Sequence, residues 1–159
     1  MGRPRGFDEN QVIRAAVVLF GGRAYDGVSV DDLVEHLGVH RNSLYKTFGS
    51  KRGLYLAALR RSLADDVAPL AEAAGAAGSA ADAVDRLVRT APDAVGLDLL
   101  LLAAVERAPV DAEVAAEVDG ALTRMEAALA RVDPGRAAHL TDAALGGRLR
   151  ARLSRPETP

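Results

Sequence analysis

Apolar side chains recur three or four positions apart along almost the whole chain, whereas strand-forming aromatic residues and threonine are scarce. This spacing predicts an all-α protein. In the first part of the chain each apolar repeat is bordered by a capping residue or by glycine, which marks where a helix begins or ends. Asp8 and Ser29 are the expected N-caps, and Gly38 the expected stop of the second helix. The four helices expected here cover residues 8–20, 29–37, 40–48 and 50–70.

The second half of the chain keeps the helical spacing after a weaker segment. Residues 71–79, rich in Ala and Gly, predict a connector with little structure of its own. About four helices should follow, and each has a local start signal. These signals are Ser79, Pro92 with Asp93, Asp111, and Asp133 with Pro134 in the first turn.

The four early helices and the later ones predict two helical domains. Three short helices would form a helix-turn-helix domain, and the fourth would connect it to a helical C-terminal domain of about four helices. A chain of 159 residues is long enough to bury a core in this way. We place the first domain at 1–62, the second at 63–154, and a disordered tail at 155–159.

The composition indicates the cellular compartment of the protein more clearly than its function. With 49% apolar but 4% aromatic residues, the interior must be built from Ala, Leu and Val. The absence of cysteine excludes disulfides and thiolate metal sites, and suits a reducing cytoplasm. The first ten residues lack the apolar core of a signal peptide. The longest apolar run, 95–105, is interrupted by Asp98 and is too short to span a bilayer. We therefore expect a cytoplasmic protein without a membrane partner.

The net charge of −2 conceals a strong asymmetry between the two halves. Residues 1–62 hold ten Lys and Arg against six Asp and Glu, whereas residues 63–159 hold ten against sixteen. Between residues 40 and 61 there are six cations and no acid. Such asymmetry points to contact with nucleic acid, although a solvated basic helix face would give the same count.

The third predicted helix carries the side chains best suited to reading DNA. It follows the second helix after a Gly-containing turn, which is the layout of a helix-turn-helix in the major groove. Donors and acceptors of this kind match the base edges exposed there, although any short helix with one solvated face looks similar. The outward positions are Arg41, Asn42, Ser43, Tyr45, Lys46 and Thr47.

The start of the fourth helix adds a physical reason to expect a phosphate. Lys51 and Arg52 occupy its first turn, where the helix dipole is positive and cations are unfavourable. A phosphate between the helix amides and the lysine would reverse that effect. Two more cations, Arg3 and Arg5, lie in a Gly- and Pro-rich N-terminus that could reach into a minor groove. The alternative is that Lys51 and Arg52 are exposed cations at a mildly unfavourable helix start, and that the N-terminus is a basic tail without a DNA contact.

The N-terminal part of the chain resembles the DNA-binding domain of the TetR family of bacterial repressors. The likeness covers roughly residues 3–60 and is most specific in the run SLYKTF with SK after it. It implies a homodimer that binds a palindromic operator, with a helical C-terminal domain that binds a small-molecule effector and releases the DNA. It also implies DNA contacts by Arg41, Ser43, Tyr45 and Thr47, and phosphate contacts by Ser29, Tyr45 and Lys51.

Two departures from the family pattern matter. His40 stands where such proteins usually have Ser or Thr as the cap of the recognition helix, so this helix start is less well fixed. The chain is also short for the family, in which the last two of nine or more helices form the dimer interface. The final helix is missing from the predicted set, which leaves the usual interface in doubt.

The C-terminal half shows no catalytic constellation, and we expect neither an enzyme nor a cofactor. The three histidines do not converge with other ligands, so a metal site is not expected. Asp98, Glu106 and Arg107 could be polar fixtures of an effector pocket, or satisfied surface or interface residues. Gly146 and Gly147 indicate either a close helix approach in a dimer or the end of the last helix.

Two other functions fit the residues less well. A constitutive DNA-binding dimer would lack a cavity of roughly 300 Å³ or more in the C-terminal domain. A helical adaptor would bind its partner with little dependence on salt, whereas DNA binding falls steeply as salt rises. The effector itself should be small and largely hydrophobic, because the C-terminal core is lined by apolar side chains.

Overall fold

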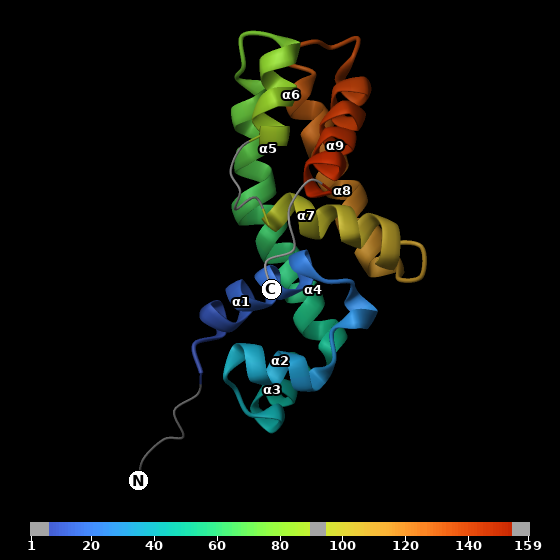
Figure 1. Ribbon diagram of the computed structural model, residues 1–159. Helices are drawn as coiled ribbons and strands as arrows, with labels where there is room; N and C mark the ends of the chain where they lie inside the picture. Colours follow the sequence, from blue (N-terminus) through green and yellow to red (C-terminus); the bar gives the residue numbers. More distant parts are fainter. Residues whose placement is uncertain (1–6, 90–94, 154–159) are drawn as a thin grey trace.

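The computed structural model describes residues 7–89 and 95–153, and within them all regular structure is helical (Figure 1). The N-terminal head, α1–α4, occupies one end of the molecule, and the helices that follow form an elongated body at the other. The all-α prediction is confirmed. The elements are α1 Glu9–Gly22, η1 Tyr25–Gly27, α2 Val30–Leu37, α3 Arg41–Phe48, α4 Lys51–Ser62, η2 Leu63–Val67, α5 Ala68–Gly75, α6 Ala80–Arg89, α7 Val95–Leu102, η3 Ala103–Arg107, α8 Ala112–Leu129 and α9 Ala137–Leu153.

Local capping fixes the helices of the head as the sequence predicts. The Asp8 carboxylate accepts hydrogen bonds from the backbone N–H groups of Asn10 and Gln11, which begins α1. Ser29 and Asp32 form a reciprocal capping box at the start of α2. Gly38 ends α2 in the left-handed region with φ 62°, which glycine adopts without strain. The short turn η1 between α1 and α2 was not expected from the sequence.

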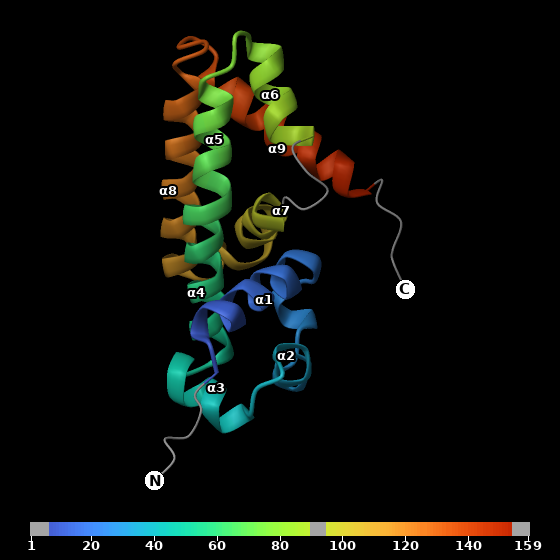
Figure 2. The ribbon, with the colours of Figure 1, turned by 90° about the vertical axis from the view of Figure 1, so that its left-hand side faces the viewer.

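A continuous rod of α4, η2 and α5 joins the head to the body (Figure 2). The predicted end of the fourth helix near Leu70 is therefore wrong, and so is the connector at 71–75, whereas residues 76–79 do form the expected connector. Pro69 lacks an N–H group and crowds the preceding turn, but a wider π-turn just before it lets the helix continue. Ala71, Ala74 and Gly75 are buried in the body, and this packing keeps their segment helical.

The body consists of two helix pairs, and α7 runs across the molecule between them and the head (Figure 1). In the first pair, α5 packs on α8; a methyl group at Gly75 would lie 2.5 Å from the Ala128 carbonyl oxygen. In the second pair, α6 packs on α9, and a methyl group at Gly147 would lie 2.6 Å from Val88. The close approach at Gly147 is therefore made within the chain, and α9 does not end at Gly146.

The expected start of the last helix is also corrected. Asp133, Pro134 and Gly135 form a turn, and α9 begins at Ala137. The Arg136 N–H donates to the Asp133 carbonyl oxygen at 3.2 Å, so this stretch closes on itself before the helix starts. The starts signalled by Ser79 and Asp111 are confirmed, because both side chains accept backbone N–H groups of the following turn.

Some predictions concern residues outside the described ranges. These are the minor-groove contacts of Arg3 and Arg5, the helix start at Pro92 and Asp93, and the disordered tail at 155–159. In the part of the chain that the structure covers, no helix is long and apolar enough to cross a membrane.

A buried ion pair ties α9 to α7 at the centre of the body. Arg148 donates from Nε and Nη2 to the two carboxylate oxygens of Asp98 at 2.9 and 3.0 Å. Both side chains are at most 4% exposed. Asp98 is thus a satisfied interior residue, a role that differs from both the pocket and the surface or interface roles expected for it.

Candidate DNA interface

The recognition helix, α3, is held by one apolar face and leaves its polar face free. Leu44 is 1% exposed, and the Phe48 ring stacks on Phe7 with centroids 6.2 Å apart. The six residues proposed to read DNA come together on the outer side of this eight-residue helix, at the far end of the head from the body (Figure 1). Among them Ser43 is half-buried, and Arg41, Asn42, Tyr45, Lys46 and Thr47 are exposed.

Two features set how this helix begins and how its first cation lies. His40 is the N-cap residue, but its side chain makes no capping hydrogen bond, as its departure from Ser or Thr predicts. Arg41 forms an ion pair with Asp31 of α2, and both side chains are at least half exposed. The guanidinium is therefore held beside the polar face by a weak, easily exchanged contact.

The turn between α3 and α4 is closed by glycines that the sequence analysis did not single out. Gly49 has φ 75°, and its N–H donates to the Tyr45 carbonyl oxygen at 2.8 Å. A methyl group on Gly53 would overlap the Phe48 carbonyl oxygen. Because of this close approach, the end of α3 lies directly against the first turn of α4. The Ser50 hydroxyl caps α4 by accepting the Gly53 N–H at 3.0 Å.

The two cations at the start of α4 have different partners. Arg52 donates to both carboxylate oxygens of Asp111, at 2.7 and 2.8 Å, and to Glu113 at 2.9 Å. Its charge is therefore balanced by the N-terminus of α8 in the body. Lys51 makes no ion pair within the described residues; its ammonium lies 4.0 Å from the centroid of the Tyr25 ring. The unfavourable end of the helix dipole is thus compensated at Arg52 and left open at Lys51.

Lys51 is the cation of this turn that most lacks a counter-charge. Burial lowers the pKa of its ammonium; the nearby charges of Asp26 and Asp32 oppose this only in part, and that of Arg107 adds to it. A phosphate oxygen at the start of α4 would restore the stability of the charged form, with support from the unsatisfied amides of the first turn. The geometry therefore favours an anion at Lys51 and gives no such reason at Arg52.

Of the residues expected to contact a phosphate, Ser29 has the fewest hydrogen-bonding groups still available. Its hydroxyl donates to Asp32 Oδ2 at 2.6 Å, and its N–H donates to the same oxygen at 2.7 Å. The hydroxyl also accepts the Asp32 N–H at 3.0 Å. The hydrogen bonds from Ser29 lower the pKa of the Asp32 carboxyl and keep a negative charge beside the helix start. A phosphate at Ser29 would have to replace part of this capping box.

A cluster around Tyr25 connects the head to the body, and sequence reasoning missed it. The Tyr25 ring lies edge-on to Tyr55, with centroids 5.0 Å apart, and the Arg107 guanidinium lies 4.3 Å from its centroid. The Tyr25 N–H donates to Glu106 at 3.1 Å. Since Lys51 lies near the same ring, the proposed phosphate site is connected to η3 of the body through Tyr25. Glu106 and Arg107 therefore both have partners between the two parts, although Arg107 Nε is buried without a hydrogen-bond acceptor in the described residues.

Comparison with known proteins agrees with this arrangement. Residues 12–58, which include α2, α3 and most of α4, match the family model for bacterial regulatory proteins of the tetR family. Within these residues the chain carries a DNA-binding domain of the tetR type. It is 44% identical over 71 residues to the HTH-type transcriptional repressor BdcR of Escherichia coli K12. It is 43% identical over 72 residues to the HTH-type transcriptional regulator YezE of Bacillus subtilis 168.

The likeness to these two TetR relatives covers 45% of this chain but only 36% and 37% of theirs. Solved structures extend the comparison of the fold beyond the head. The TetR-family regulator CifR, determined as a cysteine mutant with a 26-bp double-stranded operator DNA, aligns over 98% of this chain and 92% of its own. That alignment has a TM-score of 0.70 at 22% identity, so the whole chain shares the TetR fold.

Proposed function

We propose that this protein is a TetR-family repressor that binds a palindromic operator as a homodimer and leaves it when a small effector binds. The observation that carries the proposal is the placement of the polar face of α3 beside Lys51. The polar face of α3 lies at the exposed end of the head (Figure 1), and Lys51, in the first turn of the next helix, makes no ion pair within the described residues. Phosphate contacts of this kind position a recognition helix, and base contacts specify the sequence.

Each proposed contact has a distinct task. Arg41 on the first turn of α3 would leave Asp31 and read a guanine, while Asn42, Ser43 and Thr47 contact neighbouring base edges. Tyr45 and Lys46 would contact the backbone beside the groove, and Lys51 a phosphate at the start of α4. Ser29 would supply a further phosphate contact, and Arg3 and Arg5 would follow the minor groove.

A homodimer is proposed because one recognition helix reads only a half-site. Two heads separated by one turn of DNA, roughly 34–36 Å, fit a palindromic operator. The outer side of α9 offers the apolar surface for such pairing: Leu149 is 51% exposed and Leu153 is 80% exposed. Burying two exposed leucines from each copy would favour association.

Release by an effector is supported by an open groove of about 680 Å³ on the body, which a purely constitutive DNA-binding protein does not need. The proposal is tested by fluorescence anisotropy with DNA from the region upstream of the protein's own gene. We expect binding that Arg41→Ala weakens in a sequence-dependent way and Lys51→Ala weakens on all sequences. No binding at low salt, or no effect of either substitution, would refute the proposal.

A further inference from the structure

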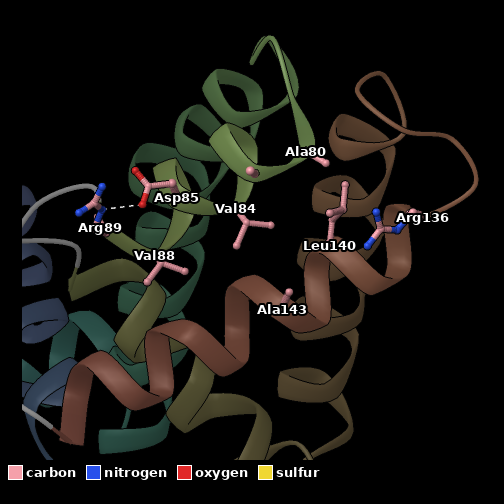
Figure 3. Close-up of a pocket in the computed structure, with 9 residues that line it drawn as sticks. Ala80, Val84, Asp85, Val88, Arg89, Arg136, Leu140 and Ala143 are labelled. Carbon is pink, nitrogen blue, oxygen red and sulfur yellow. Dashed lines mark ion pairs between the residues drawn. The ribbon is translucent and has the colours of Figure 1, made fainter.

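The 680 Å³ cavity is a groove between α6 and α9 (Figure 3). Its floor is apolar, with Ala80, Val84 and Val88 on α6 facing Leu140 and Ala143 on α9. Val88 lies against Gly147 of α9 at one end of the groove. Ala80 and Arg136 line the other, open end (Figure 3). From Ala80 to Val88 the helix rises about 12 Å, which is room for an extended hydrocarbon chain or a flat ring system.

The charges around the groove select the kind of molecule that fits it. Asp85 and Arg89 on the rim form an ion pair with each other and so cancel (Figure 3). Arg136, at the open end, makes no ion pair in the part of the chain that the structure describes. The groove therefore combines an apolar floor with one uncompensated guanidinium, a group that binds carboxylates and phosphates well.

We propose that this groove binds an amphiphile with one anionic head, the head on Arg136 and the apolar body on Val84, Val88 and Leu140. A second copy of the chain is the less suitable occupant, because the exposed leucines of α9 point away from the groove. At 3.6 residues per turn, Leu149 and Leu153 lie on the side of α9 opposite to Leu140 and Gly147.

The far end of the same helix is attached to the head. Arg152 donates to the Gly21 carbonyl oxygen at 2.7 Å, at the C-terminus of α1, where a cation is favourable. Arg148 and Arg152 both form ion pairs with Asp98 of α7, and α7 in turn packs on α1. α9 is thus one rigid element with the groove at its start and α1 at its end. An amphiphile that wedges α6 and α9 apart would move Arg152 relative to α1 and so alter the position of the head.

This second step, from α9 to the head, rests on the proposed DNA binding, whereas ligand binding in the groove does not. The first measurement is therefore equilibrium dialysis with decanoate alone. We expect saturable binding by the native chain, about tenfold weaker binding by Arg136→Gln, and none by Val84→Asp. Arg124→Gln, on the exposed side of α8 away from the groove, is the matched control and should bind as the native chain does. Decyltrimethylammonium, with the same chain length and the opposite charge, should not bind.

The second measurement adds decanoate to the DNA complex. We expect decanoate to lower DNA affinity about fivefold or more in the native chain. In Arg152→Gln it should still bind, but with a smaller effect on DNA affinity. Equal decanoate binding by the native chain, Arg136→Gln and Val84→Asp would overturn the groove site. Loss of decanoate binding when the protein dimerises would also overturn the groove site, because a second copy of the chain would then occupy the groove. If decanoate binds as described but no DNA is bound at all, the proposed function fails and the groove site stands.

Discussion

The buried pair of Asp98 and Arg148 should be the largest single electrostatic determinant of folding in the body. Both side chains are at most 4% exposed, and they share two hydrogen bonds of 2.9 and 3.0 Å. Arg148→Met would leave the Asp98 carboxylate buried, with the more distant Arg152 at 3.8 Å. Removing one partner of a buried pair costs about 3–5 kcal/mol, because the other charge stays desolvated.

The corresponding measurement is urea unfolding followed by circular dichroism. We expect Arg148→Met to lose about 3–5 kcal/mol of unfolding free energy, and its Tm to fall by about 6–20 °C at roughly 2–4 °C per kcal/mol. Arg89→Met is the matched control, because Arg89 pairs with Asp85 on the exposed face of α6. It should cost about 0.3–0.5 kcal/mol.

A double variant separates charge burial from lost packing. In Asp98→Leu with Arg148→Met neither charge remains buried, so most of the stability lost in the single variant should return. A single variant within about 1 kcal/mol of the native chain would refute the reasoning. A double variant as unstable as the two single changes added together would refute it too.

Three further predictions concern the head and the dimer. Gly53→Ala should destabilise the fold by about 1–3 kcal/mol and reduce DNA affinity, because the new methyl group pushes α3 away from α4. The control is Gly22→Ala, since Gly22 has open space around it, and both variants are compared by urea unfolding and DNA-binding anisotropy. Arg52 lowers the pKa of the Asp111 carboxyl, and Arg60 together with Arg52 lowers that of the Glu113 carboxyl. These ion pairs therefore contribute fully to stability above the ordinary carboxyl pKa, and the contribution is lost as pH falls through the lower pKa values of the folded state. Unfolding free energy should therefore fall below about pH 4, and Arg52→Gln should flatten this dependence; an unchanged acid limb would contradict the pairing. Leu149→Glu should shift the protein toward monomer in sedimentation velocity, whereas Arg124→Gln should not, and an unaltered dimer would exclude the α9 face.

Local signals in the sequence predicted the head well. The caps at Asp8 and Ser29 and the stop at Gly38 depend on residues within one turn of each other, so the sequence pattern alone contains them. The polar face of α3 follows from the burial of Leu44 and Phe48 in the same way. These short-range relations explain why the recognition helix was placed to within one residue.

The errors arose where distant packing decides the local structure. Residues 71–75 stay helical because Ala74 and Gly75 fit against α8, more than fifty residues later, and no signal near them shows it. Asp133 and Pro134 have the pattern of a helix start but form a turn that ends at Arg136.

The interpretation of the two cations on α4 needed the structure most. The sequence gives Lys51 and Arg52 the same unfavourable position at a helix start, and it predicts a phosphate at the lysine but no partner for the arginine. Arg52 is neutralised by Asp111, which is 59 residues away, and Lys51 lies on a tyrosine 26 residues before it. Long-range partners of this kind separate a structural cation from a candidate DNA contact.

The salt dependence of operator binding by Lys51→Gln and Arg52→Gln tests the central claim most directly. Each phosphate contact contributes about 0.9 to the slope of log affinity against log salt. The account predicts that Lys51→Gln lowers this slope by about one, while Arg52→Gln leaves it unchanged because its charge is already neutralised within the protein. Equal slopes for the native chain and Lys51→Gln, or a lower slope for Arg52→Gln alone, would contradict it.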